Sequence, residues 1–79
     1  MKWSDGMSII ITNKIEEKVN EYQRRTGASK KWIASQMGMS PQRMYSLFKA
    51  DNMMLDVAYK FVVFLDCKIE DLFEYEVSK

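Results

Sequence analysis

Apolar residues recur at helical spacing in five segments of the chain, with polar residues between them. This pattern predicts helices over about residues 14–25, 30–37, 41–48, 55–65 and 69–73. The positions that share the inner faces of these helices are Ile15, Val19, Tyr22, Ile33, Ala34, Met37, Met44, Leu47, Phe48, Leu55, Ala58, Phe61, Val62, Leu65, Ile69, Leu72 and Phe73. Such a pattern is typical of a small helical domain.

The residues before the first helix follow a different pattern. Three isoleucines at positions 9–11 favour extended backbone, because β-branched side chains fit strands better than helices. This run is too short to form a sheet by itself, so it either covers the helical core or pairs with a second copy. We therefore expect an all-α fold: an extended arm over residues 1–12, with Met7 as an alternative start to Met1, and a compact five-helix domain over residues 13–75. The tail from Glu74 is expected to fray.

Capping residues define a tight turn between the second and third helices. Ser29 and Ser40 are suited to N-cap these helices, and Pro41 suits a first helical position. Gly38 stands just past the last apolar position of the second helix, where a left-handed residue commonly ends a helix. Ala34 is small enough for the two helices to approach closely. The arrangement indicates a helix-turn-helix over about residues 30–49, a motif whose second helix enters the DNA major groove.

Two other local patterns carry structural predictions. Asn13 and Glu16 have the spacing of a capping box for the first helix. The helix over residues 55–65 is apolar on nearly every side, and in so small a chain it cannot be covered all round. We expect a dimer or partner interface formed by Val57, Val63 and Phe64, joined by Ile9 and Ile11 of the arm. Met53 and Met54 are expected to fill core gaps, and Trp32 to cover the first helix or the arm.

Composition excludes several classes of protein. The chain has 79 residues, no histidine and one cysteine, which argues against an internal disulfide and the usual zinc sites. It has no activated nucleophile pair and no glycine-rich phosphate loop, so we expect neither an enzyme nor a cofactor, a metal or a small-molecule substrate. Glu17 and Glu21 are interpreted as a solvated helix face. The apolar run at residues 61–65 is too short to span a membrane, and the polar start is not expected to be a signal peptide. The single cysteine fits a reducing, cytoplasmic setting.

The distribution of charge is more informative than its sum. The net charge is +1, but residues 22–50 carry six bases and no acid, whereas residues 1–21 sum to −1 and residues 51–79 to −4. The basic block coincides with the helix-turn-helix segment. It predicts a basic face on an otherwise acidic molecule, which would suit binding to nucleic acid. The plainer interpretation is an ordinary solvated surface.

These features resemble the DNA-binding domain of the lambda repressor and Cro family, also called XRE-type helix-turn-helix proteins. The matching positions are Ile33–Ala34, Gly38–Met39–Ser40, Met44, Leu47, Phe48 and the segment LDCKIEDLF at residues 65–73. The resemblance extends over about residues 13–73. Pro41 stands where many relatives carry glutamine, and Asp66 where glycine is usual. The arm has no counterpart in the minimal family pattern.

The resemblance implies which residues meet DNA. Base edges in the major groove would be contacted by Pro41, Gln42, Tyr45 and Ser46. Phosphates would be contacted by Lys30, Lys31, Ser40, Arg43, Lys49 and Asn52. Gln42 can contribute base preference, because its amide can pair with both exposed edge atoms of adenine.

Two functional classes remain open. The first is a sequence-specific regulator that binds double-stranded DNA as a homodimer, such as a phage or bacterial repressor of Cro type. The second is an interaction module, antirepressor or antitoxin-like, that binds another phage or bacterial regulator through the arm and the helix over residues 55–65. The acid-free basic block favours the first, whereas the low net charge and Pro41 favour the second.

Overall fold

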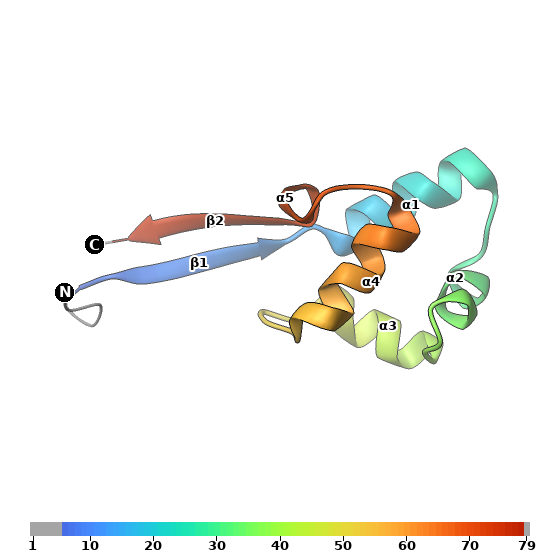
Figure 1. Ribbon diagram of the computed structural model, residues 1–79, viewed down its shortest axis with the longest axis horizontal. Coiled ribbons are helices and arrows are strands. Elements are labelled where there is room, and N and C mark those ends of the chain that lie inside the picture. Colours follow the sequence, from blue (N-terminus) through green and yellow to red (C-terminus); the bar gives the residue numbers. More distant parts are fainter. Residues whose placement is uncertain (1–5, 79) are drawn as a thin grey trace.

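The helices form one body, and two strands project from it as a ribbon (Figure 1). The structure is a computed structural model that describes residues 6–78. Along this part of the chain the elements are β1 (Ser8–Asn13), α1 (Ile15–Thr26), α2 (Lys30–Gln36), α3 (Pro41–Phe48), α4 (Leu55–Leu65), α5 (Ile69–Leu72) and β2 (Phe73–Ser78). Of the arm expected over residues 1–12, and of the two candidate starts, residues 1–5 lie outside the described part. None of the described helices has the length and apolar character needed to cross a membrane.

The ribbon corrects the all-α prediction. β1 runs antiparallel to β2, with Ser8 opposite Ser78 and Asn13 opposite Phe73. The isoleucine run is indeed extended, but it finds its partner in the same chain. The expectation of a fraying tail is wrong for the same reason: Phe73, Tyr75 and Val77 alternate with polar residues, which is a strand period. The fold is therefore mainly helical with a two-stranded antiparallel sheet.

The helix boundaries follow local capping chemistry. α3 and α4 have the predicted bounds, while α1, α2 and α5 differ from them by one residue. The hydroxyl oxygens of Ser29 and Ser40 accept hydrogen bonds from the amides of Trp32 and Arg43, at 3.0 and 3.1 Å. The capping box predicted for Asn13 and Glu16 does not form. Instead, α1 begins at Ile15, whose amide donates to Oδ1 of Asn13 at 2.9 Å.

All five described helices contribute to one core. Its buried side chains are Ile15, Val19, Ile33, Ala34, Met37, Met44, Leu47, Phe48, Val57, Ala58, Phe61, Leu65 and Leu72. Val57 therefore packs inside the molecule and drops out of the interface expected on α4. Leu55 and Met54, expected to point inward, are both more than two-thirds exposed. The reason is that α1 and α5 lie against a narrower stripe of α4 than its apolar composition indicates.

Asp66 ends α4 in the left-handed conformation, with φ at 53°. An L-residue is strained there, although aspartate is among the more tolerant residues. Its carboxylate also stands at the negative end of the helix dipole. We therefore expect Asp66→Gly to raise the free energy of unfolding in urea by about 0.5–1 kcal/mol. Asp66→Ala is the matched control, because it removes the same charge without freeing the backbone. A glycine variant no more stable than the alanine variant contradicts the strain argument.

Candidate nucleic-acid interface

The turn between α2 and α3 has the geometry expected of a helix-turn-helix. Gly38 adopts φ of 73°, and the amide of Met39 donates to the carbonyl of Ala34 at 3.0 Å. Ala34 is fully buried, so its small side chain lies where the two helices meet. Met44, Leu47 and Phe48 anchor α3 to the core. The opposite side of α3 faces solvent, at the lower edge of the body in Figure 1.

The four side chains expected to contact bases lie on the first two turns of α3. Gln42 and Ser46 are exposed and four residues apart, so they share one face of the helix. Tyr45 is 47% exposed and packs its ring edge against Phe48, with centroids 5.9 Å apart. Pro41 is half-buried at the start of the helix. This face presents an amide, two hydroxyls and an aromatic ring to solvent.

The residues expected to contact phosphate surround that face. Lys31, Ser40, Arg43, Lys49 and Asn52 are exposed. Arg43 and Asn52 also line one shallow hollow together with Ser46, so the structure brings these three together across the end of α3. Lys30 differs, because it is half-buried and its ammonium donates to Oε1 of Gln23 in α1 at 2.6 Å. Its charge is retained, but its side chain is held against α1.

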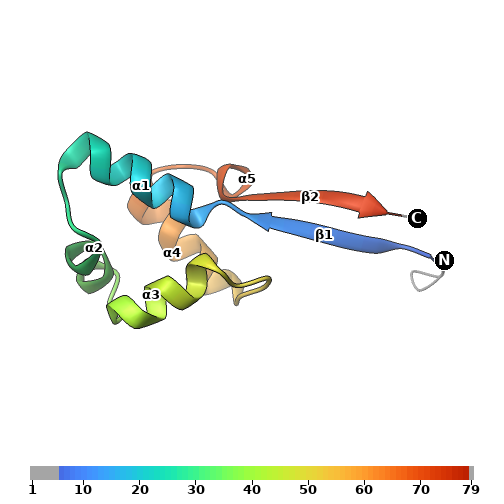
Figure 2. The same ribbon diagram turned by 180° about the vertical axis from the view of Figure 1, so that it is seen from behind.

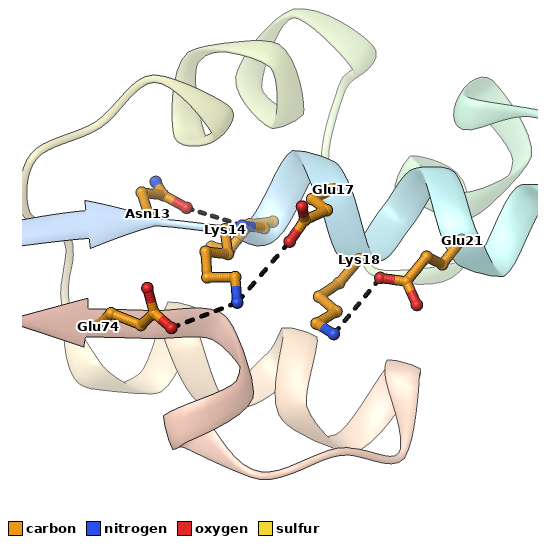
Figure 3. Close-up of polar contacts among 7 residues, drawn as sticks. Asn13, Lys14, Glu17, Lys18, Glu21 and Glu74 are labelled. Carbon is orange, nitrogen blue, oxygen red and sulfur yellow. Dashed lines mark hydrogen bonds and ion pairs between the residues drawn. The ribbon is translucent and has the colours of Figure 1, made fainter.

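The bases of residues 22–50 remain available to an external anion. Within residues 6–78, ion pairs join Lys14 to Glu17 and Glu74, at 3.8 and 3.5 Å, and Lys18 to Glu21 at 3.3 Å. Figure 3 shows these carboxylates grouped along α1 and the start of β2. The three acids in these pairs are thus joined to lysines outside the basic block. Arg25 lies over the ring of Tyr22, 5.5 Å from its centroid, and lines a hollow that also includes Glu21, Asp66 and Asp71.

A contact that sequence reasoning missed holds α3 in place. Nδ2 of Asn13 donates to the carbonyls of Leu47 and Ala50, at 2.8 and 3.0 Å, while its Oδ1 accepts from Ile15. One amide therefore joins the end of β1, the start of α1 and the last turn of α3. Both carbonyls lie at or just past the end of α3, where a helix runs out of its own amide donors. The carbonyl of Leu47 also accepts from the amide of Ala50 at 3.3 Å. Asn13 lies 34 positions before Leu47 and 37 before Ala50, so no local sequence pattern indicates this contact.

The residues expected at a partner interface fall into separate places. Ile9 and Ile11 are exposed on the ribbon, and Val63 is 78% exposed on α4. Phe64 is half-buried instead, with its ring 5.1 Å from that of Tyr22 and 6.3 Å from that of Trp32. Trp32, expected on the first helix or the arm, packs against Phe64 of α4 and borders a hollow with Tyr22 and Thr26 of α1. Ile9 and Ile11 share a groove with Leu55 and Ala58 of α4, but Val63 and Phe64 do not line it.

The described residues carry no candidate metal site, since no three His, Cys, Asp or Glu side chains among them are grouped to hold an ion. Cys67 is half-buried against the core. Desolvation, and then the carboxylate of Asp71, raises the pKa of its thiol. A raised pKa lowers the thiolate fraction, so this cysteine is a weak nucleophile.

Comparison with protein families identifies the domain. The family model of the Cro/C1-type HTH DNA-binding domain matches residues 8–78. The chain belongs to this family. No curated protein and no solved structure gave a match in the corresponding searches. The matched region of this Cro/C1-type domain begins with β1 and ends with β2, so the ribbon lies inside it. The family is one of DNA-binding domains, which are typically not enzymes, and DNA is the partner that membership implies.

Proposed function

We propose that this Cro/C1-type domain is a sequence-specific transcriptional regulator that binds double-stranded DNA as a dimer. In this proposal α3 lies in the major groove, where Gln42, Tyr45, Ser46 and Pro41 meet base edges. Lys31, Arg43, Lys49 and Asn52 contact phosphates around them, with the hydroxyl of Ser40. Lys30 adds its charge from beside α1. The protein acts in the cytoplasm of a bacterium, as a phage or bacterial repressor that occludes polymerase.

One observation carries this proposal: the outward face of α3 is exposed and is framed by bases that form no ion pair within residues 6–78. No acid occurs in residues 22–50, and the described ion pairs use none of the bases there. A phosphate approaching α3 therefore meets positive charge without first displacing a carboxylate. Phosphate contacts of this kind fix the register of a protein on DNA, while the groove-facing side chains read the sequence.

The experiment that tests this assignment is a selection of bound fragments from random DNA, repeated with two variants. Gln42→Ala removes a bidentate partner of adenine, so we expect the preference at one base pair to fall by about 5–150-fold, equivalent to about 1–3 kcal/mol. Lys31→Ala removes a phosphate contact and should weaken binding to all sequences alike. Equal loss of preference in both variants would remove α3 as the recognition helix.

An interaction module that binds another regulator is the second candidate. It is favoured by the exposed isoleucines of β1, which a DNA-binding surface does not use. Such a module would bind no DNA fragment selectively and would show little response to salt. The selection therefore separates the two candidates directly.

A further inference from the structure

The ribbon of β1 and β2 exposes several large apolar side chains to solvent. It projects from the helical body in both views (Figures 1 and 2). Ile9, Ile10 and Ile11 are 56%, 57% and 46% exposed, on both faces of β1. A lone two-stranded ribbon is marginally stable in water, and further pairing or packing is what stabilises it. The ribbon is therefore a candidate for an interface.

The two edges of the ribbon differ in chemistry. β2 carries Glu74 and Glu76, whereas β1 has the sequence SIIITN, without a charge or a proline. Exposed edge strands are normally protected against pairing by lysine, proline or a bulge. β1 has six residues in regular register with β2, and no such protection. Within residues 6–78 no second strand pairs with its outer edge, which is therefore available to a strand from another copy.

We propose that two copies of this chain pair along β1, antiparallel and around a two-fold axis, into a four-stranded sheet ordered β2–β1–β1–β2. This inference rests on the proposed function, which includes a dimer, and it identifies the interface of that dimer. In this dimer the two-fold axis passes between Ile10 and the partner's Ile10, and Ile9 lies opposite the partner's Ile11. Antiparallel pairing of a strand with itself satisfies two-fold symmetry without further adjustment.

Charge selects this edge over the other. Pairing along β2, centred on Tyr75, sets Glu74 directly opposite the partner's Glu76, and like charges in that position are destabilising. Pairing along β1 leaves both acidic strands on the outside of the four-stranded sheet. The same arrangement puts uncharged residues against uncharged residues along the whole length of β1. A second copy thus complements the β1 edge better than the β2 edge.

The pairing also extends an apolar face. Ile9 lies opposite Val77 and Ile11 opposite Tyr75 within the ribbon. Across the axis they continue into the partner's Ile11 and the partner's Ile9, which gives two rows of four apolar side chains. This face borders a groove of about 460 Å³ whose other side includes Met53 and Leu55 of the body. Lateral contacts in the rows cover isoleucine surface that is exposed in one chain.

The symmetry suits DNA recognition. The two-fold axis of an edge-to-edge antiparallel pair is perpendicular to the sheet, so both apolar faces lie on the same side of it. The α3–α4 loop lines the groove on that side, through Asn52 and Met53. Both loops, and the α3 helix leading into each, therefore lie on one side of the assembly. Two recognition helices on one side are what a two-fold DNA site requires.

The first test is the oligomeric state of the full chain without DNA, measured by sedimentation. Ile10→Lys places two ammonium groups across the axis in the dimer, yet in one chain the new side chain faces Glu76, a favourable cross-strand pair. We expect the dimer dissociation constant to rise at least about tenfold, with the circular dichroism spectrum unchanged. Val63→Lys, at an exposed position of α4, is the matched control and should leave the dissociation constant unchanged. A monomeric wild-type chain, or dissociation by the Val63 variant alone, overturns the proposal.

The second test identifies the edge by cross-linking in a Cys67→Ala background. Directly opposed residues of antiparallel strands have Cα atoms about 4.5–5.5 Å apart, within the range of a disulfide. Ile10→Cys should therefore form a disulfide-linked dimer under mild oxidation. Glu76→Cys, at the in-ribbon partner of Ile10, should not. The reverse result overturns pairing along β1.

These tests separate the dimer from its function. A dimer linked through Ile10→Cys that binds no selected DNA fragment refutes the regulator proposal and leaves the interface intact. A wild-type chain that binds DNA selectively but sediments as a monomer refutes the interface and leaves the regulator proposal intact.

Discussion

Raising monovalent salt from about 50 to about 200 mM is expected to weaken DNA binding by about 100-fold for each protomer, and by about the square of that for a dimer. The estimate follows from four cations per protomer, Lys30, Lys31, Arg43 and Lys49, each releasing one condensed counterion. Their combined contribution to the slope of log K against log salt is about −3.6 per protomer. Fluorescence anisotropy with a selected fragment, over a series of salt concentrations, measures this slope.

Two variants identify which charges contribute to that slope. Lys31→Gln should reduce its magnitude by about 0.9 per protomer, because one phosphate contact is lost. Lys60→Gln removes another exposed charge, from α4 and outside the basic block, and should leave the slope unchanged. A slope near zero for the wild type contradicts DNA binding through α3. Equal effects of both variants would indicate a general response to net charge.

Asn13→Ala is expected to lower the free energy of unfolding by about 2–4 kcal/mol, as measured by urea denaturation. The substitution removes the donor to the carbonyls of Leu47 and Ala50 and the acceptor for the amide of Ile15. The carbonyl of Ala50 and the amide of Ile15 then lose this partner, whereas the carbonyl of Leu47 keeps the amide of Ala50 at 3.3 Å. Partly buried polar groups left unpaired cost about 1–3 kcal/mol each. A domain of this size has a total stability of only about 4–12 kcal/mol, so the loss is large.

Two further variants test the mechanism of that loss. Asn13→Asp keeps an oxygen for the Ile15 amide but places a carboxylate against two carbonyls, so it should destabilise at least as much as alanine. Thr12→Ala, at the exposed neighbouring position, should change stability by less than about 0.5 kcal/mol. An aspartate variant as stable as the wild type would show that the two donated hydrogen bonds contribute little.

The helix-turn-helix could be predicted because its signals are local. Ser40 and Pro41 define the start of α3, and Gly38 defines the turn before it, within four residues of chain. Apolar spacing then identifies the buried side of α3, and the remaining positions must face outward. The candidate DNA-contacting residues follow from that geometry and from the family resemblance. Their contacts with DNA stay predictions until they are measured.

Other features depended on residues far apart in the chain. β1 was expected to be extended, but its partner, β2, begins about sixty residues later. The apolar pattern of α4 likewise shows which of its positions are apolar, but not which of them other helices cover. Val57 was therefore assigned outward and is buried, whereas Leu55 was assigned inward and is exposed.

By itself, the sequence determined the helices, the turn and the basic character of residues 22–50, because capping, periodicity and charge operate between residues a few positions apart. The tertiary structure alone decided that β1 and β2 form a ribbon, that Asn13 holds the end of α3, and which side of α4 is buried. Those features depend on which distant segments come into contact. Such contacts are selected by the packing of the whole core, which no single segment specifies.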